Sequence, residues 1–224
     1  GGRLQLESAD GKLLNSESAV ATHPATDPGF DQFVSDPAKP VPYSEEITNR
    51  MTNEYMTDDQ RFAARRPDVL VYQSDILTDD LVMAGPLQAQ FYASTSETDA
   101  DFVVKLIDVF PDGADAARLP NYQMMVRSEV LRGRFRNSYE KPEAFVPNQP
   151  AAIHLELLDV LHRFQKGHRI MIQIQSTWFP LVDRNPQQFV PNIYFAKPED
   201  FRSAVHRVYR TTQHPATISF GQLP

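Results

Sequence analysis

Histidine and acidic side chains are the first candidates for chemistry in this sequence, because they ligate metals and transfer protons. His154 and Glu156 are two residues apart, so on a strand both would point to one face and could join a distant histidine around a first-row metal ion. None of the six histidines forms a His-x-His pair, and no third ligand stands out. Exposed strand faces also carry such polar side chains for solubility. We therefore predict no metal site and no cofactor.

A calcium site is the second option, because Asp108, Asp112 and Asp115 are close in the sequence. Their spacing does not match an EF-hand loop, and Pro111-Asp112-Gly113 is typical of a turn. We interpret Asp112 as a turn residue.

Serine-based catalysis needs a positioned nucleophile, and the glycines argue against one. The nine glycines include no pair that frames a serine as G-x-S-x-G, and none that forms G-x-G-x-x-G or a P-loop. The motif-like strings Ser35-Asp36-Pro37 and Lys166-Gly167-His168-Arg169 are interpreted as a turn before proline and as a glycine turn. In the second string we expect neighbouring carbonyls to satisfy His168 and Arg169. No catalytic residue is assigned.

Charge and composition exclude several classes of protein. The 224 residues carry 22 Lys+Arg against 29 Asp+Glu, a net charge of −7, which gives no electrostatic reason to bind nucleic acid. No window approaches the roughly 18 apolar residues of a membrane span, so we predict no membrane segment. Cysteine is absent, which removes disulfides and leaves both a cytoplasmic and an exported, periplasmic location open.

From Pro67 onward, short apolar segments with a period of two alternate with turn signals, which indicates strands. Residues 153–157 and 169–175 have aliphatic side chains on one face only, as half-buried antiparallel strands do. A short helix is expected at 198–203. We predict an all-β fold, a jelly-roll (galactose-binding-like) β-sandwich over 67–224. The expected strands are 68–76, 86–93, 101–110, 122–131, 153–157, 169–175, 204–211 and 216–220.

The segment 1–66 has a different character, with few long apolar runs and many prolines. Proline favours extended conformations, so this segment is predicted as a leader that wraps along a surface. Leu4-Gln5-Leu6 could form one short strand, and residues 49–64 could hold a helical turn or two.

Several of these strings together resemble one family. It is that of the cocaine-esterase-like serine hydrolases, which includes α-amino-acid ester hydrolases, glutaryl (cephalosporin) acylases and X-Pro dipeptidyl-peptidases, and the resemblance is to their C-terminal part. Single strings are weak signals, but seven in the family's order are specific. They are Val34-Ser-Asp-Pro-Ala-Lys-Pro-Val-Pro-Tyr43, Asp59-Gln-Arg-Phe62, Arg66-Pro-Asp-Val-Leu-Val-Tyr72, Ala84-Gly-Pro86, Asp101-Phe-Val-Val-Lys-Leu-Ile-Asp-Val-Phe-Pro-Asp-Gly113, Lys166-Gly-His-Arg169, and Phe179-Pro180 followed by Asp183-Arg-Asn-Pro186.

The resemblance implies a non-catalytic β-sandwich that follows an α/β-hydrolase domain carrying the Ser-His-Asp triad. Such a domain packs on the hydrolase domain of the same protein, helps wall the active-site entrance and often takes part in homo-oligomer contacts. The loop between Tyr43 and Gln60 would lie nearest the pocket, with Tyr55, Met51 and Met56 as candidate lining residues. The alternative for Tyr55 is a role in packing without contact to the pocket.

A different class of function stays open beside this one. A free-standing jelly-roll module that binds a ligand such as carbohydrate would show exposed aromatic side chains on a concave sheet face. The leader favours the accessory domain, because a long extended segment serves as a strap across a neighbouring domain and has little use in a separate module.

Overall fold

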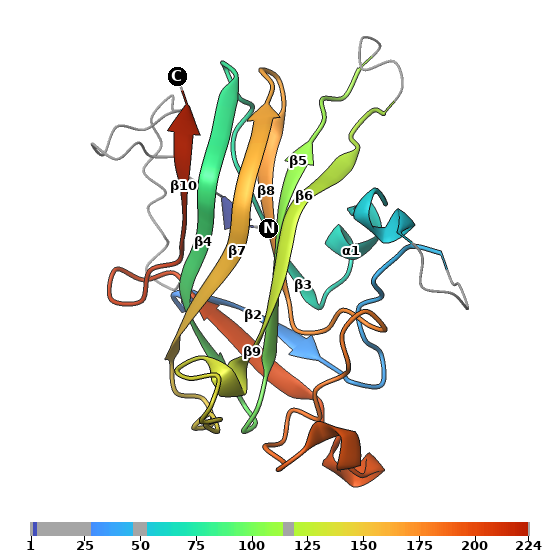
Figure 1. The fold of residues 1–224 in the computed structure, drawn as a ribbon, viewed down its shortest axis with the longest axis vertical. Coiled ribbons are helices and arrows are strands. Elements are labelled where there is room, and N and C mark those ends of the chain that lie inside the picture. The colour runs from blue at the N-terminus through green and yellow to red at the C-terminus, as the bar shows by residue number, and fades with distance from the viewer. Residues whose placement is uncertain (1, 4–27, 47–52, 114–118, 224) are drawn as a thin grey trace.

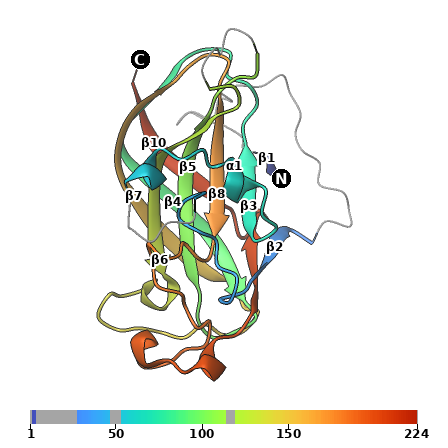
Figure 2. The ribbon, with the colours of Figure 1, turned by 90° about the vertical axis from the view of Figure 1, so that its right-hand side faces the viewer.

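Two five-stranded sheets face each other in the computed structural model, which describes residues 2–3, 28–46, 53–113 and 119–223. Figures 1 and 2 show the two layers in perpendicular views. The first sheet has the order β1 (Gly2–Arg3), β3 (Val69–Gln73), β8 (Arg169–Gln175), β5 (Asp101–Val109) and β6 (Gln123–Arg132). The second has the order β10 (Thr217–Leu223), β4 (Leu81–Thr95), β9 (Ala204–Tyr209) and β2 (Phe30–Ser35), and β7 (Ala151–Phe164) also pairs with β4.

All these pairings are antiparallel except that of β1 with β3. The predicted all-β sandwich of jelly-roll type is confirmed. Among the described residues, no helix has the length and apolar character needed to cross a bilayer.

The main core lies between the two sheets and is built from alternate residues of the central strands. Phe102 and Leu106 of β5 face Phe91 of β4 and Ile153 of β7, and all four are at most 4% exposed. The rings of Phe91 and Phe102 meet edge to face at 5.7 Å. Burial of such side chains is the principal favourable term in folding.

Each predicted strand is present, but three are longer than expected, and β10 ends at Leu223 instead of residue 220. β4 begins at Leu81 and β7 continues to Phe164. In β7 the apolar alternation stops at Leu158, which has a φ of 64° and is exposed. The β4–β7 register shifts nearby, between Pro86 and Gln88. Because the bulge interrupts the alternation, a period-two pattern does not predict the second half of β7.

Strand β2 was not predicted. It lies within the segment 1–66 and pairs with β9 from Phe30 opposite Tyr209 to Ser35 opposite Ala204. Figure 1 shows β2 and β9 running obliquely across the lower part of the sandwich. Part of the predicted leader therefore belongs to the second sheet. The short strand predicted at Leu4-Gln5-Leu6 lies outside the described residues.

The rest of the described leader covers the outer face of the first sheet, and we call residues 36–46 and 53–66 the strap. It contains a 3₁₀ turn, η1 (Glu54–Met56), and a single helical turn, α1 (Arg61–Ala64), as the sequence suggested. Figure 2 shows α1 beside β3 and β8. Because the strap covers this face, six of the seven residues of β8 are buried, and the prediction of a half-buried strand was wrong there. β7 does alternate as predicted over Ile153–Leu157.

In the part of the chain that the structure describes, three further 3₁₀ turns lie in the connections: η2 (Gly133–Phe135), η3 (Ile193–Phe195) and η4 (Pro198–Asp200). The last one falls in the segment predicted as a short helix.

Candidate functional site

The strap is fastened to the segment that follows β8 by backbone pairing. The Val41 amide donates to Oγ1 of Thr177 at 2.8 Å, and the Phe179 amide donates to the Val41 carbonyl at 2.9 Å. The Tyr43 amide donates in turn to the Phe179 carbonyl at 2.9 Å. Proline at 40 and 42 keeps the chain extended, so the strap can run alongside this segment, and Pro42 bridges Phe179 in parallel.

This pairing brings three aromatic rings together under the strap. The Tyr55 ring of η1 lies 5.5 Å from the Tyr43 ring and 5.9 Å from the Trp178 ring, centre to centre. Tyr43 and Trp178 are 4% and 5% exposed, whereas Tyr55 is partly buried. Met56 is 46% exposed on the same turn, and Met51 lies outside the described residues. Of the three candidate lining residues, the structure thus places Tyr55 and Met56 together.

A buried lysine lies beneath the same cluster. Nζ of Lys105 donates to Oε1 of Gln60 at 2.9 Å and lies 4.8 Å from the centre of the Trp178 ring. Lys105 and Gln60 are both fully buried. Desolvation lowers the pKa of Lys105 to about 7, because burial disfavours the charged amine. The sequence did not suggest this contact, since the two residues are 45 positions apart.

The string Asp59-Gln60-Arg61 ties the strap to β6. The Asp59 carboxylate accepts from Nε of Arg61 at 2.6 Å and from the Gln123 amide at 3.3 Å. The Gln60 amide donates to the Gln123 carbonyl at 3.0 Å. The hydrogen bond and charge of Asp59 raise the pKa of Arg61. Each of the three residues has a structural partner.

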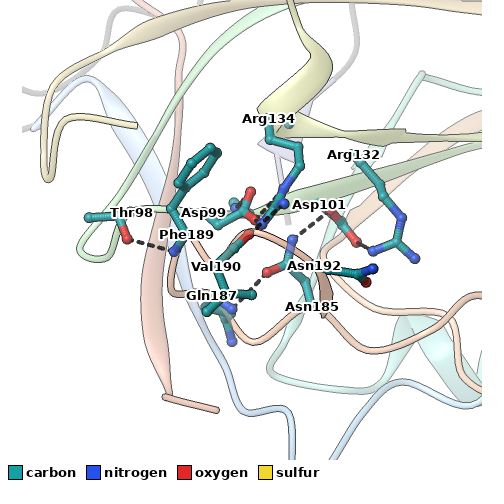
Figure 3. A network of polar contacts seen from close by, with 12 residues as sticks. Thr98, Asp99, Asp101, Arg132, Arg134, Asn185, Gln187, Phe189, Val190 and Asn192 are labelled. Atoms are coloured by element: carbon teal, nitrogen blue, oxygen red, sulfur yellow. Dashed lines mark hydrogen bonds and ion pairs between the residues drawn. The ribbon is translucent and has the colours of Figure 1, made fainter. Parts of the chain in front are cut away.

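A buried polar network holds the loop after β8 against the first sheet (Figure 3). Arg134 pairs with Asp99 through two nitrogens and donates from Nη1 to the Val190 carbonyl at 2.9 Å. Nδ2 of Asn185 donates to Oδ1 of Asp101 at 2.8 Å. Desolvation raises the pKa of both carboxyls, that of Asp101 to about 7.

One serine lies beside a histidine, but the pair lacks the arrangement of a catalytic triad. Oγ of Ser176 is 3.2 Å from Nε2 of His206, and that nitrogen also lies 2.7 Å from Oε1 of Gln187. Nδ1 of His206 has no partner among the described residues, so no carboxylate orients the ring. Both side chains are buried, and desolvation lowers the pKa of His206 to about 3.

A second histidine cluster lies at the opposite end of β5. The Asp108 carboxylate is 2.7 Å from Nδ1 of His168 and 2.9 Å from Nε2 of His162. The glycine turn predicted carbonyl partners for His168 and Arg169, and this prediction is wrong for His168, which bonds a carboxylate. It was right for Arg169, whose Nη1 donates to the Ser74 carbonyl at 2.9 Å.

Among the described residues, the metal candidates of the sequence do not come together. His154 and Glu156 are exposed on β7, and Asp115 lies outside the described residues. In the part of the chain that the structure describes, no group of three His, Asp or Glu side chains is arranged to hold a metal ion.

The family model of the X-Pro dipeptidyl-peptidase C-terminal non-catalytic domain matches residues 5–219. The chain belongs to this family. The matched range includes both the strap and the sandwich, so the family is defined over nearly all of the sequence.

This X-Pro dipeptidyl-peptidase C-terminal domain is similar to a part of several larger hydrolases. The cocaine esterase of Rhodococcus sp. (strain MB1 Bresler) is 32% identical over 188 residues, which are 84% of this chain and 31% of the esterase. A solved α-amino acid ester hydrolase is 44% identical, with a TM-score of 0.85. The match covers 89% of this chain and 33% of the hydrolase chain. An aminopeptidase from the marine sediment archaeon Thaumarchaeota archaeon is 45% identical with a TM-score of 0.83, covering 87% and 33%. The chain thus spans about a third of each relative.

Proposed function

We propose that this non-catalytic domain packs on an α/β-hydrolase catalytic domain of the same protein, a serine hydrolase of acylase, α-amino-acid ester hydrolase or X-Pro dipeptidyl-peptidase type. The observation that carries the proposal is the match of residues 5–219 to a non-catalytic family within relatives named as hydrolases, of which the chain spans 31–33%. In this role the domain stabilises the hydrolase and shapes the entrance to its active site.

The strap is the part that we place nearest the active site. Tyr55 and Met56 lie on η1, where Met56 is 46% exposed and Tyr55 rests on two buried rings. A partly exposed aromatic ring with a fixed underside is suited to contact a substrate side chain. Met51 is the third proposed lining residue. We also propose that the whole protein forms a homo-oligomer, which light scattering of the purified protein tests.

The binding-module alternative would need aromatic side chains on a sheet face. Among the described residues, the most exposed aromatics are Tyr139, Tyr194 and Phe195, and they lie in a loop and in η3. Their position off the strands favours the accessory domain over a carbohydrate module.

Hydrolysis assays test the non-catalytic role directly. The 224-residue chain is incubated with a p-nitrophenyl ester and an amino-acid ester, and then with a serine-reactive phosphonate followed by mass spectrometry. We expect neither turnover nor an adduct. Turnover with a labelled serine would overturn the proposal and identify the nucleophile.

The strap proposal needs a second experiment in the longer protein that carries the domain. Tyr55→Ala should change KM for amino-acid esters with large side chains, because it removes a wall of the entrance. Tyr139→Ala, in the loop after η2, is the control and should leave KM unchanged. Equal kinetics for both variants would place the strap away from the substrate.

A further inference from the structure

A cavity of about 370 Å³ lies at the end of the first sheet, away from the aromatic cluster. The last residues of β3 and β5 and the first residues of β6 and β8 meet there, and α1 closes one side. Its size falls in the range of about 300 to 1,000 Å³ that is usual for small-molecule pockets. Six of its lining residues are arginines or amides: Arg61, Arg65, Arg169, Gln73, Asn121 and Gln123.

Among the described residues, the lining carries three positive charges and no acidic side chain. Arg61 is neutralised by Asp59, which lies outside the lining. The guanidinium of Arg169 donates only to the Ser74 carbonyl among the described residues, so its charge has no carboxylate partner among them. The guanidinium of Arg65 makes no hydrogen bond or ion pair to any described residue, and this side chain is exposed. Two guanidinium groups without a carboxylate partner among the described residues therefore lie at one cavity in a chain whose net charge is −7.

These groups match one class of ligand. A guanidinium presents parallel N–H donors that bind a carboxylate or a phosphate through two hydrogen bonds. The three side-chain amides supply further donors that can turn toward an oxygen atom. We propose that this cavity binds a small oxyanion with two negative charges, such as a phosphate or a dicarboxylate, between Arg65 and Arg169. The inference is independent of the accessory function proposed above.

Titration calorimetry of the 224-residue chain tests the proposal. Inorganic phosphate and malonate are titrated separately. Sodium chloride is adjusted to hold the ionic strength constant, because a change in screening would otherwise alter the apparent affinity. We expect saturable one-to-one binding of a dianion and no binding of acetate. Tighter binding of phosphate would identify a phosphate site, and tighter binding of malonate a dicarboxylate site.

Two variants locate the site. Arg65→Gln and Arg169→Gln should each raise the dissociation constant about tenfold or more, because each removes one charged pair of hydrogen bonds. Arg202→Gln is the matched control, since Arg202 is an exposed arginine whose Nη1 lies 3.8 Å from Glu97. It should bind the anion as the wild type does.

The outcome that overturns the proposal is equally definite. No saturable binding of either dianion, or the same affinity in the Arg65→Gln and wild-type chains, would show that the cavity is not an anion site. Because Arg65 is exposed, its substitution should leave the core intact. Circular dichroism checks that each variant is folded.

Discussion

The buried amine of Lys105 donates to the side-chain carbonyl of Gln60 at 2.9 Å and so joins the strap to the middle of the first sheet. No described acidic group pairs with this amine, and the Trp178 ring is its other close neighbour. The contact holds an ionisable group in a place where water cannot solvate its charge.

Stability should therefore depend on the protonation of Lys105. Its pKa falls from 10.5 to about 7 on folding, so between these values the unfolded chain holds the proton and the folded chain does not. Stability then rises as the pH increases from 7 to 10.5, by up to about 1.4 kcal/mol per pH unit. Urea unfolding at pH 7 and pH 9 should show this increase in the wild type and lose it in Lys105→Met. The exposed Lys141→Met should keep the wild-type increase, and an unchanged slope in Lys105→Met would contradict the assignment.

Arg134 should be among the most sensitive positions for stability. Arg134→Met leaves the buried Asp99 carboxylate without its cation, which costs about 3–5 kcal/mol in buried ion pairs. The double variant Arg134→Met with Asp99→Asn should lose less than Arg134→Met alone, because no uncompensated charge remains. Urea unfolding measures both. Arg163→Met, which removes an exposed pair with Asp80 at 3.4 Å, serves as the control and should cost below about 1 kcal/mol.

His206 should make the domain sensitive to acid. Burial lowers its pKa from 6.5 to about 3, so the unfolded chain takes up a proton first and stability is lost as the pH falls through this interval. Asp101 acts in the opposite direction, because its pKa rises from 3.8 to about 7 and the folded chain holds that proton. The two slopes oppose each other between pH 3.8 and 6.5.

For this reason the test compares variants and does not rely on the wild-type profile alone. His206→Gln should lose less stability than the wild type between pH 6.5 and 4, measured by thermal unfolding at each pH. The exposed His154→Gln should follow the wild type. If His206→Gln also follows it, the buried imidazole does not control the acid limb.

Gly133 should not tolerate a side chain. A Cβ at this position would lie 2.5 Å from the Ala100 carbonyl oxygen and 2.7 Å from the Phe145 ring. Because the first neighbour is backbone, it cannot move aside easily, and Gly133→Ala should cost about 1–3 kcal/mol as overpacking does. A melting temperature equal to that of the wild type would mean that η2 shifts freely.

The parts of the fold that were predictable are those in which a local pattern reports burial. Ile153 to Leu157 alternates cleanly, and the structure shows the same alternation. The pattern failed at β8, because the strap that buries its outer face comes from more than a hundred residues earlier. It also failed at β2, because nothing near this short segment between two Asp-Pro dipeptides in the sequence indicates its pairing with β9.

The site shows the same division. The strings around Tyr55 and Asp59 are recognisable as motifs of the family, and this resemblance predicts that the loop between Tyr43 and Gln60 lies nearest the active site. Their partners were not, because hydrogen bonds such as Lys105 to Gln60 and Asn185 to Asp101 join positions 45 and 84 residues apart. Composition and spacing do not predict which distant donor meets which acceptor. These pairings are known only from the packed structure.

The pairing of β2 with β9 also bears on how the protein is made. Arg210 and Asp31, at one end of this pair, are 179 positions apart and are joined at 3.1 Å. During synthesis the chain emerges from its N-terminal side, so β2 leaves the ribosome long before its only strand partner in the described sheet. Distant pairings of this kind also slow folding. The pairing of β2 with β9 can thus form only after translation has passed Tyr209, and ribosomes stalled before that codon should display an unpaired β2.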